Sequence, residues 1–175
     1  LKIIGAAKIK ELVWHEDAFA IGFNFGLLTS LVKLDMSVEK ASGYRNGSFM
    51  ASTNGMLLLE EVNMRNNLLA RNGDNGNVAT LDLSWQGRLK KLDVRGTGLT
   101  RVKLATGAPV VQLCLPDTIE ELFLEYLTKL QDSGLVLDGI NNVRGYRYTN
   151  CPGIDGFAML DRLHQARLNG SGKLE

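Results

Sequence analysis

Apolar residues recur along the chain in a short pattern, apolar-x-x-apolar-x-apolar, whose last two apolar positions alternate with polar ones. Seven copies of this pattern start at Ile9, Leu31, Leu59, Val78, Leu99, Ile119 and Val143. Successive copies start 22, 28, 19, 21, 20 and 24 residues apart. Alternation with a period of two is that of a β-strand with one buried face, and a repeat of about 22 residues is typical of solenoids. The pattern therefore predicts a mainly-β repeat solenoid of about seven coils.

A second set of similar segments lies about halfway between the main copies in the second half of the chain. Its members are Leu89-Leu92-Val94, Val110-Leu113-Leu115 and the weaker Leu135-Leu137. We therefore expect coils with strands on one or both of their long sides. Apolar side chains from both sides would then share one continuous core, because a single coil cannot bury its apolar face alone.

The repeat ends near Pro152-Gly153, and a different pattern follows. Asp155 is suited to cap a helix, and Phe157, Leu160 and Leu163 follow it near helical spacing. A helix over about 156–168 would cover the open end of the stack. We therefore divide the chain into a solenoid over 1–154 and a capping helix with a tail over 155–175. Because the first residue is Leu1, we also expect a fragment of a longer protein.

Three segments resemble the leucine-rich repeat consensus LxxLxLxxNxL. They are Leu59 to Leu69 (LEEVNMRNNLL), Leu89 to Leu99 (LKKLDVRGTGL) and Val143 to Pro152 (VRGYRYTNCP). The resemblance places Asn67, Thr97 and Cys151 at the asparagine position, where the family's side chain hydrogen-bonds backbone groups at a corner. It implies that these three residues have a structural role in the turns, which for Cys151 we favour over a reactive thiol.

Other segments resemble particular kinds of leucine-rich repeat. Residues 9–19 and 110–124 look like the irregular repeats of bacterial surface proteins, and residues 115–154 are similar to leucine-rich segments in structural proteins of phages that infect gut Bacteroidetes. The resemblance implies a non-catalytic scaffold or recognition module, located in a phage virion (tail or capsid-associated) or at a bacterial cell surface. Such repeats serve many unrelated partners, so the resemblance does not name one.

The expected register gives a candidate binding face on the outer side of the main strands. Its members are Val13, Asp35, Asn63, Asp82, Lys103, Phe123 and Arg147 in one column, with Arg65, Arg101 and Glu125 beside it. Phe123, with Tyr126 beyond it, is the best anchor, since aromatic side chains dominate interface energies. The same face could instead be a solvated surface with cross-strand pairs such as Asp82 beside Lys103, or could pack against a neighbouring domain.

A second functional class is a parallel β-helix enzyme that acts on polysaccharide, because such solenoids have coils of similar length. Its polar residues would be Asp35, Asp82, Arg101, Lys103 and Arg147, which the expected register places on one side. The leucine-rich pattern, with Asn, Thr or Cys at the turn, fits the chain better. We therefore expect a module without catalytic activity.

Composition narrows the range of ligands. The net charge of +1 argues against nucleic acid, and no apolar run approaches the roughly 18 residues of a membrane span. Two Cys and two His cannot form a disulfide framework or a usual zinc site. The run from Asn66 to Asn77 lacks the spaced acidic ligands of a calcium loop. We expect no metal and no cofactor, no insertion into a membrane, and as partner a protein, a glycan or neighbouring domains of the parent chain.

Overall fold

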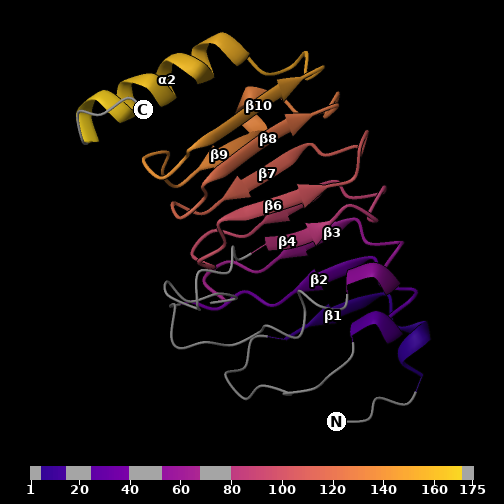
Figure 1. Cartoon of the computed structure of the whole chain (residues 1–175). Coiled ribbons are helices and arrows are strands. Elements are labelled where there is room, and N and C mark those ends of the chain that lie inside the picture. The colour runs from indigo at the N-terminus through magenta and orange to yellow at the C-terminus, as the bar shows by residue number, and fades with distance from the viewer. Residues whose placement is uncertain (1–4, 15–24, 40–52, 68–79, 171–175) are drawn as a thin grey trace.

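The chain forms a parallel β-solenoid of about five turns with a helix at its C-terminal end (Figure 1). The computed structural model describes residues 5–14, 25–39, 53–67 and 80–170. This architecture confirms the mainly-β solenoid predicted from the apolar repeat. It has about five turns in place of the seven coils expected.

The strands form two parallel sheets. The larger sheet has the order β1-β2-β3-β5-β7-β9 and the smaller sheet the order β10-β8-β6-β4. The strands of the larger sheet are β1 (Glu11–Val13), β2 (Lys33–Asp35), β3 (Glu61–Asn63), β5 (Lys91–Asp93), β7 (Gln112–Leu115) and β9 (Leu135–Leu137). Those of the smaller sheet are β4 (Thr80–Leu83), β6 (Arg101–Leu104), β8 (Glu121–Glu125) and β10 (Gly145–Thr149). Short 3-10 helices are η1 (Ala6–Lys8), η2 (Phe25–Leu27), η3 (Thr53–Gly55) and η4 (Asp132–Gly134).

The register of the larger sheet defines the length of each turn. The inward residues Leu12, Leu34, Val62, Leu92, Leu113 and Leu135 are paired in that order, so successive partners differ by 22, 28, 30, 21 and 22 residues. Turns near 22 residues agree with the spacing seen in the sequence. The two longer turns flank β3 and enclose the ranges 40–52 and 68–79, which lie outside the described residues.

The seven main copies of the pattern do not form one column of strands. The first three supply β1, β2 and β3 of the larger sheet, whereas the last four supply β4, β6, β8 and β10 of the smaller sheet. The second set continues the larger sheet as β5, β7 and β9. The same pattern builds strands on both sides of the coil, so spacing alone cannot tell which side a copy belongs to.

A repeated turn closes one corner of the coils. In each case the N–H of the last residue donates to the carbonyl oxygen three positions earlier, at distances of 3.0 to 3.3 Å. The pairs joined in this way include Leu28 and Leu31, Met56 and Leu59, Gln86 and Leu89, Ala105 and Ala108, and Leu127 and Leu130. All ten of these residues are buried. All of them except Gln86 join the inward strand residues in one hydrophobic core that runs along the stack.

Helix α2 (Gly156–Gly170) lies across the C-terminal end of the stack (Figure 1). The predicted N-cap is confirmed, because Asp155 Oδ1 accepts hydrogen bonds from the N–H groups of Phe157 (3.1 Å) and Ala158 (2.9 Å). Met159 and Leu163 form the buried side of the helix. The apolar stripe expected from the sequence is buried only in part, because Phe157 is 86% exposed and Leu160 is 52% exposed. Among the described residues, no helix has the length and hydrophobicity of a membrane span.

Candidate functional site

The structure divides the candidate binding face between the two sheets. Val13, Asp35 and Asn63 lie on the larger sheet, with Arg65 just beyond β3. Asp82, Arg101, Lys103, Phe123, Glu125 and Arg147 lie on the smaller sheet. The five polar residues that a β-helix enzyme would need are separated in the same way, since Asp35 is on the larger sheet and the other four are on the smaller one.

Charges of opposite sign alternate along the outer face of the larger sheet. The ammonium group of Lys33 lies 3.8 Å from the carboxylate of Glu11, and that of Lys91 lies 3.2 Å from the carboxylate of Glu61. A groove of about 360 Å³ runs over β1, β2, β3 and β5 between these side chains. Because the groups are largely exposed, each pair contributes well under about 1 kcal/mol.

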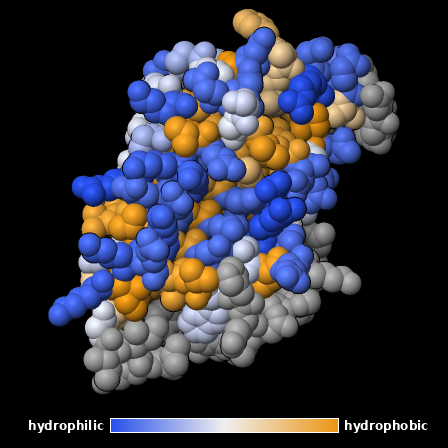
Figure 2. Space-filling view, turned by 180° about the vertical axis from the view of Figure 1, so that it is seen from behind, coloured by the Kyte–Doolittle hydropathy of each residue, from blue (hydrophilic) through white to orange (hydrophobic). Residues whose placement is uncertain are grey.

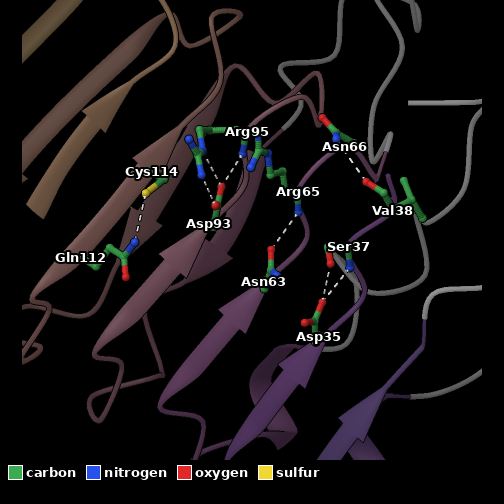
Figure 3. Close-up of polar contacts among 10 residues, drawn as sticks. All are labelled: Asp35, Ser37, Val38, Asn63, Arg65, Asn66, Asp93, Arg95, Gln112 and Cys114. Carbon is green, nitrogen blue, oxygen red and sulfur yellow. Dashed lines mark hydrogen bonds and ion pairs between the residues drawn. The ribbon is translucent and has the colours of Figure 1, made fainter. Parts of the chain in front are cut away.

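Asp and Asn side chains at the strand ends of the larger sheet hold the backbone that follows them (Figure 3). The Oδ1 atoms of Asp35, Asn63 and Asp93 accept hydrogen bonds from the N–H group two residues later, at 3.0, 3.2 and 3.2 Å. On the smaller sheet, Asp82 Oδ1 accepts in the same way from Ser84 N–H at 3.0 Å. These contacts are Asx turns, in which the side chain replaces a backbone acceptor. The column of Asp and Asn therefore has a local structural role.

Among the described residues of the larger sheet, Asp93 and Arg95 form the most enclosed ion pair, and Cys114 lies beside them on the next strand (Figure 3). Arg95 donates from Nε and Nη2 to the two carboxylate oxygens of Asp93, at 3.0 and 2.6 Å. Cys114 is buried beside them, and its burial, followed by the charge of Asp93, raises the pKa of the thiol. Sequence reasoning missed Asp93 and Arg95 because it took outward columns from the main strands, whereas β5 comes from the second set.

The outer face of the smaller sheet carries three ion pairs between neighbouring coils. Arg101 pairs with Glu121, Lys103 Nζ lies 3.6 Å from Asp82 Oδ2, and Arg147 Nη1 lies 3.5 Å from Glu125 Oε1. The guanidinium of Arg147 also lies 4.7 Å from the centre of the Phe123 ring, a cation–π contact. The face thus balances its own charges.

Asp82 is the candidate carboxylate whose ionisation is most clearly perturbed. A hydrogen bond from the Ser84 hydroxyl, together with the Ser84 N–H and the nearby ammonium of Lys103, holds the pKa of Asp82 below its usual value. The carboxylate is therefore ionised at neutral pH. A general acid at neutral pH needs the opposite shift.

A recess of about 460 Å³ opens in the smaller sheet beside β6. We call it the β6–β8 recess, and its lining is Ser84, Arg101, Val102, Lys103, Leu104, Thr106, Glu121, Phe123, Glu125 and Leu127. The ladder between β6 and β8 consists of the single pair Arg101 and Glu121, whereas β4 and β6 share four pairs and β8 and β10 share five. The two strands thus separate beyond their first pair.

The three proposed turn residues make side-chain hydrogen bonds to the backbone. Asn67 Nδ2 donates to the Met36 carbonyl at 2.8 Å, and Thr97 Oγ1 donates to the Val94 carbonyl at 2.6 Å. Cys151 Sγ accepts from the Leu127 N–H at 3.4 Å. Burial raises the pKa of the Cys151 thiol.

Gln86 belongs with these residues and was missed by sequence reasoning. Its Nε2 donates to the Thr53 carbonyl at 2.7 Å across neighbouring coils, and its side chain is fully buried. The signal was present, because Gln86 follows Leu81-x-Leu83 at the same distance at which Asn67 follows Val62-x-Met64.

Figure 2 shows that hydrophilic side chains dominate the described surface seen from behind, with smaller hydrophobic areas between them. Within the described residues, no group of three or more His, Cys, Asp and Glu side chains is placed to share a metal ion. Most of the run 66–77 considered for calcium lies outside those residues.

Comparison with known proteins does not assign this chain to a family. No family model, no curated protein and no solved structure matches the chain. Its function has to be argued from the two outer sheet faces.

Proposed function

We propose that the chain is a non-catalytic, leucine-rich-repeat-like module that acts as a scaffold or recognition surface within a larger protein. The larger protein would be a phage virion component, associated with the tail or capsid, or a bacterial surface protein. Its partner would be another protein or the host surface, and the outer face of the smaller sheet would make the contact.

The observation that carries this proposal is the cross-coil pairing of the outward charges. Lys103 pairs with Asp82 and Arg147 with Glu125, so these charges compensate one another across neighbouring coils. Catalytic carboxylates are usually placed so that their pKa values are shifted toward the working pH. The lowered pKa of Asp82 instead suits a rigid, permanently charged surface.

The leucine-rich-repeat part of this proposal is supported by the residues at the corners of the coils. Asn67, Thr97 and Cys151 each hydrogen-bond backbone groups from a buried position after a strand. Repeats of about 22 residues fall within the range of this family. Stacked coils with varied outward side chains make extended recognition surfaces.

Binding to intact cells tests the proposal. Fluorescently labelled chain is titrated onto Bacteroidetes cells and onto purified virion proteins of their phages. We expect saturable binding to one of them, weakened at least about tenfold by the double variant Lys103→Glu/Arg147→Glu, because it reverses two charges of this face and removes Arg147 from the Phe123 ring, and Arg and aromatic side chains are the usual anchors of such contacts.

The matched control is Lys33→Glu/Lys91→Glu, which also removes two cross-coil ion pairs but on the larger sheet. It should bind like the unaltered chain. Absence of saturable binding to either preparation contradicts the proposal, and equal losses in the two double variants contradict the assignment to the smaller sheet.

The alternative is a parallel β-helix enzyme that acts on polysaccharide, and Asp82, Arg101, Lys103 and Arg147 still share one face. Polygalacturonate and alginate are suitable probes, with release of reducing ends as the readout. We expect both the unaltered chain and Asp82→Ala to release reducing ends at the background rate only. Turnover that Asp82→Ala abolishes would establish the enzyme instead.

A further inference from the structure

We propose that the β6–β8 recess binds a neutral saccharide. This inference rests on the proposed function, since it names the class of ligand that the smaller sheet recognises. It follows from the shape of the recess, the absence of net charge in its lining and the side chains around it.

The shape has an origin in the sequence. The corner turn of the β6 coil has alanine at both ends, Ala105 and Ala108, where the coil before it has Gln86 and Leu89 and the coil after it Leu127 and Leu130. Because protein interiors are close-packed, smaller side chains let a corner lie closer to the core. This corner lies next to the recess, which opens beside β6 where only one residue pair joins β6 to β8. Its volume of about 460 Å³ is typical of a small-molecule site.

The charges around the recess compensate one another. Arg101 pairs with Glu121, and Lys103 pairs with Asp82. Glu125, which also lines the recess, pairs with Arg147. A charged ligand would have to compete with these partners. A neutral ligand with hydroxyl groups can instead use their remaining hydrogen-bonding capacity.

One donor in the lining has no partner. The Nε–H of Arg101 is buried and makes no hydrogen bond. Because this atom has almost no exposure to solvent, it does not face the open recess, and hydrogen bonds to a ligand would come from the exposed polar groups of the lining. The exposed Thr106 contributes a hydroxyl to this lining.

Aromatic side chains supply the apolar half of a saccharide site. Phe123 lines the recess. Trp85, 66% exposed, and Tyr126, 44% exposed, follow the strands on either side of β6 but are not part of the lining. A sugar ring has an apolar C–H face that packs on an aromatic ring and a rim of hydroxyl groups that seeks polar partners. Phe123 and the paired polar side chains of the lining match both.

A protein side chain inserted into the recess is the competing occupant. The buried centres of protein–protein contacts are depleted of charged residues. Here Arg101, Lys103 and Glu125 are part of the lining itself. This composition favours a hydroxylated ligand over an apolar protein anchor.

Calorimetric titration of the whole chain with four neutral oligosaccharides tests the inference: maltohexaose, cellohexaose, mannohexaose and N-acetylchitohexaose. Oligogalacturonate serves as the acidic comparison. We expect at least one neutral probe to bind, and to bind more tightly than oligogalacturonate. Failure of all four neutral probes, or tighter binding of oligogalacturonate, overturns the inference.

Two threonines provide a matched pair of variants. Thr106 and Thr128 occupy the same position of the corner turn in successive coils, and both are exposed. Thr106 lines the recess, whereas Thr128 is not part of its lining. Thr106→Trp should weaken saccharide binding at least about tenfold by filling the recess, and Thr128→Trp should leave it unchanged. Thermal melting of both variants reports whether they fold, and equal binding by the two overturns the inference.

Failure of this inference is distinguishable from failure of the proposed function. If cells or virion proteins bind the chain but no saccharide does, the recognition role stands and the saccharide site does not. If protein binding, rather than saccharide binding, is lost in Thr106→Trp, the recess receives a protein anchor and the saccharide inference is overturned.

Discussion

Leu122 and Phe123 are adjacent in β8 and point to opposite sides of the smaller sheet. Leu122 is 1% exposed in the core, whereas Phe123 contacts the guanidinium of Arg147 on the outer face. The inward position of one residue and the outward position of its neighbour fix the register of the strand, because a slip by one residue would exchange them.

Aspartate at these two positions should have unequal effects. Leu122→Asp places an unpaired carboxylate in the core, and we expect a loss of more than about 4 kcal/mol, enough to unfold many domains. Phe123→Asp loses a half-buried cation–π contact on the outer face and should cost about 1 kcal/mol. Urea denaturation measures both free energies of unfolding. Similar losses in the two variants would contradict the register.

The Asp82 carboxylate should make stability depend on pH in a defined direction. Folding lowers the pKa of Asp82, chiefly through the Ser84 hydroxyl. Its stabilising contribution is therefore complete above the unfolded-state pKa of about 4 and is lost as the pH falls through the lower folded-state value. The difference in unfolding free energy between the unaltered chain and Asp82→Asn should stay constant from pH 7 to 5 and shrink toward pH 2.

The magnitude should be modest, under about 1 kcal/mol, because the side chain is partly exposed to solvent. Ser84→Ala is the control, since it keeps the carboxylate and removes its hydroxyl donor. Its loss of stability on acidification should be smaller than that of the unaltered chain. A difference between the unaltered chain and Asp82→Asn that grows as the pH falls would have the wrong sign.

Cys114 and Cys151 should resist thiol reagents in the folded protein. Both are buried, and burial raises the pKa of both thiols, so little thiolate is present and the reagent has no access. We expect reaction with Ellman's reagent at pH 8 to be at least about a hundredfold slower than in denaturant. Fast labelling of Cys151 in the native protein would contradict its structural role at the corner.

Much of the fold could be read from the sequence because its signals are local. The alternation around Leu34 and Leu122 predicted strands and their inward sides, and Asp155 predicted the start of the helix. The division into two sheets could not be read, because the pattern at Leu59 and the pattern at Val78 are the same, although they lead to different sheets. Which side a strand joins depends on the path of the chain between them.

The candidate site was predictable in part. Asp82 and Lys103 were expected side by side, and their side chains lie 3.6 Å apart. The β6–β8 recess could not be foreseen, since it depends on how far two neighbouring strands separate. The two alanines of the β6 corner are visible in the sequence. Their effect on the surface could be judged only from the positions of the neighbouring corners.

The solenoid carries strands on two sides of its coils, and disulfide crosslinking tests this arrangement. Glu61 and Lys91 are Cα partners in the larger sheet, whereas Thr80 lies in the smaller sheet. Neighbouring parallel strands are about 4.8 Å apart, within the range that a disulfide spans. Mild oxidation of Glu61→Cys/Lys91→Cys should give a disulfide between residues 61 and 91, identified by peptide mass spectrometry, while Glu61→Cys/Thr80→Cys should give none. A disulfide between 61 and 80, together with failure of the 61–91 pair, would show that all the strands form one column and would contradict the division into two sheets.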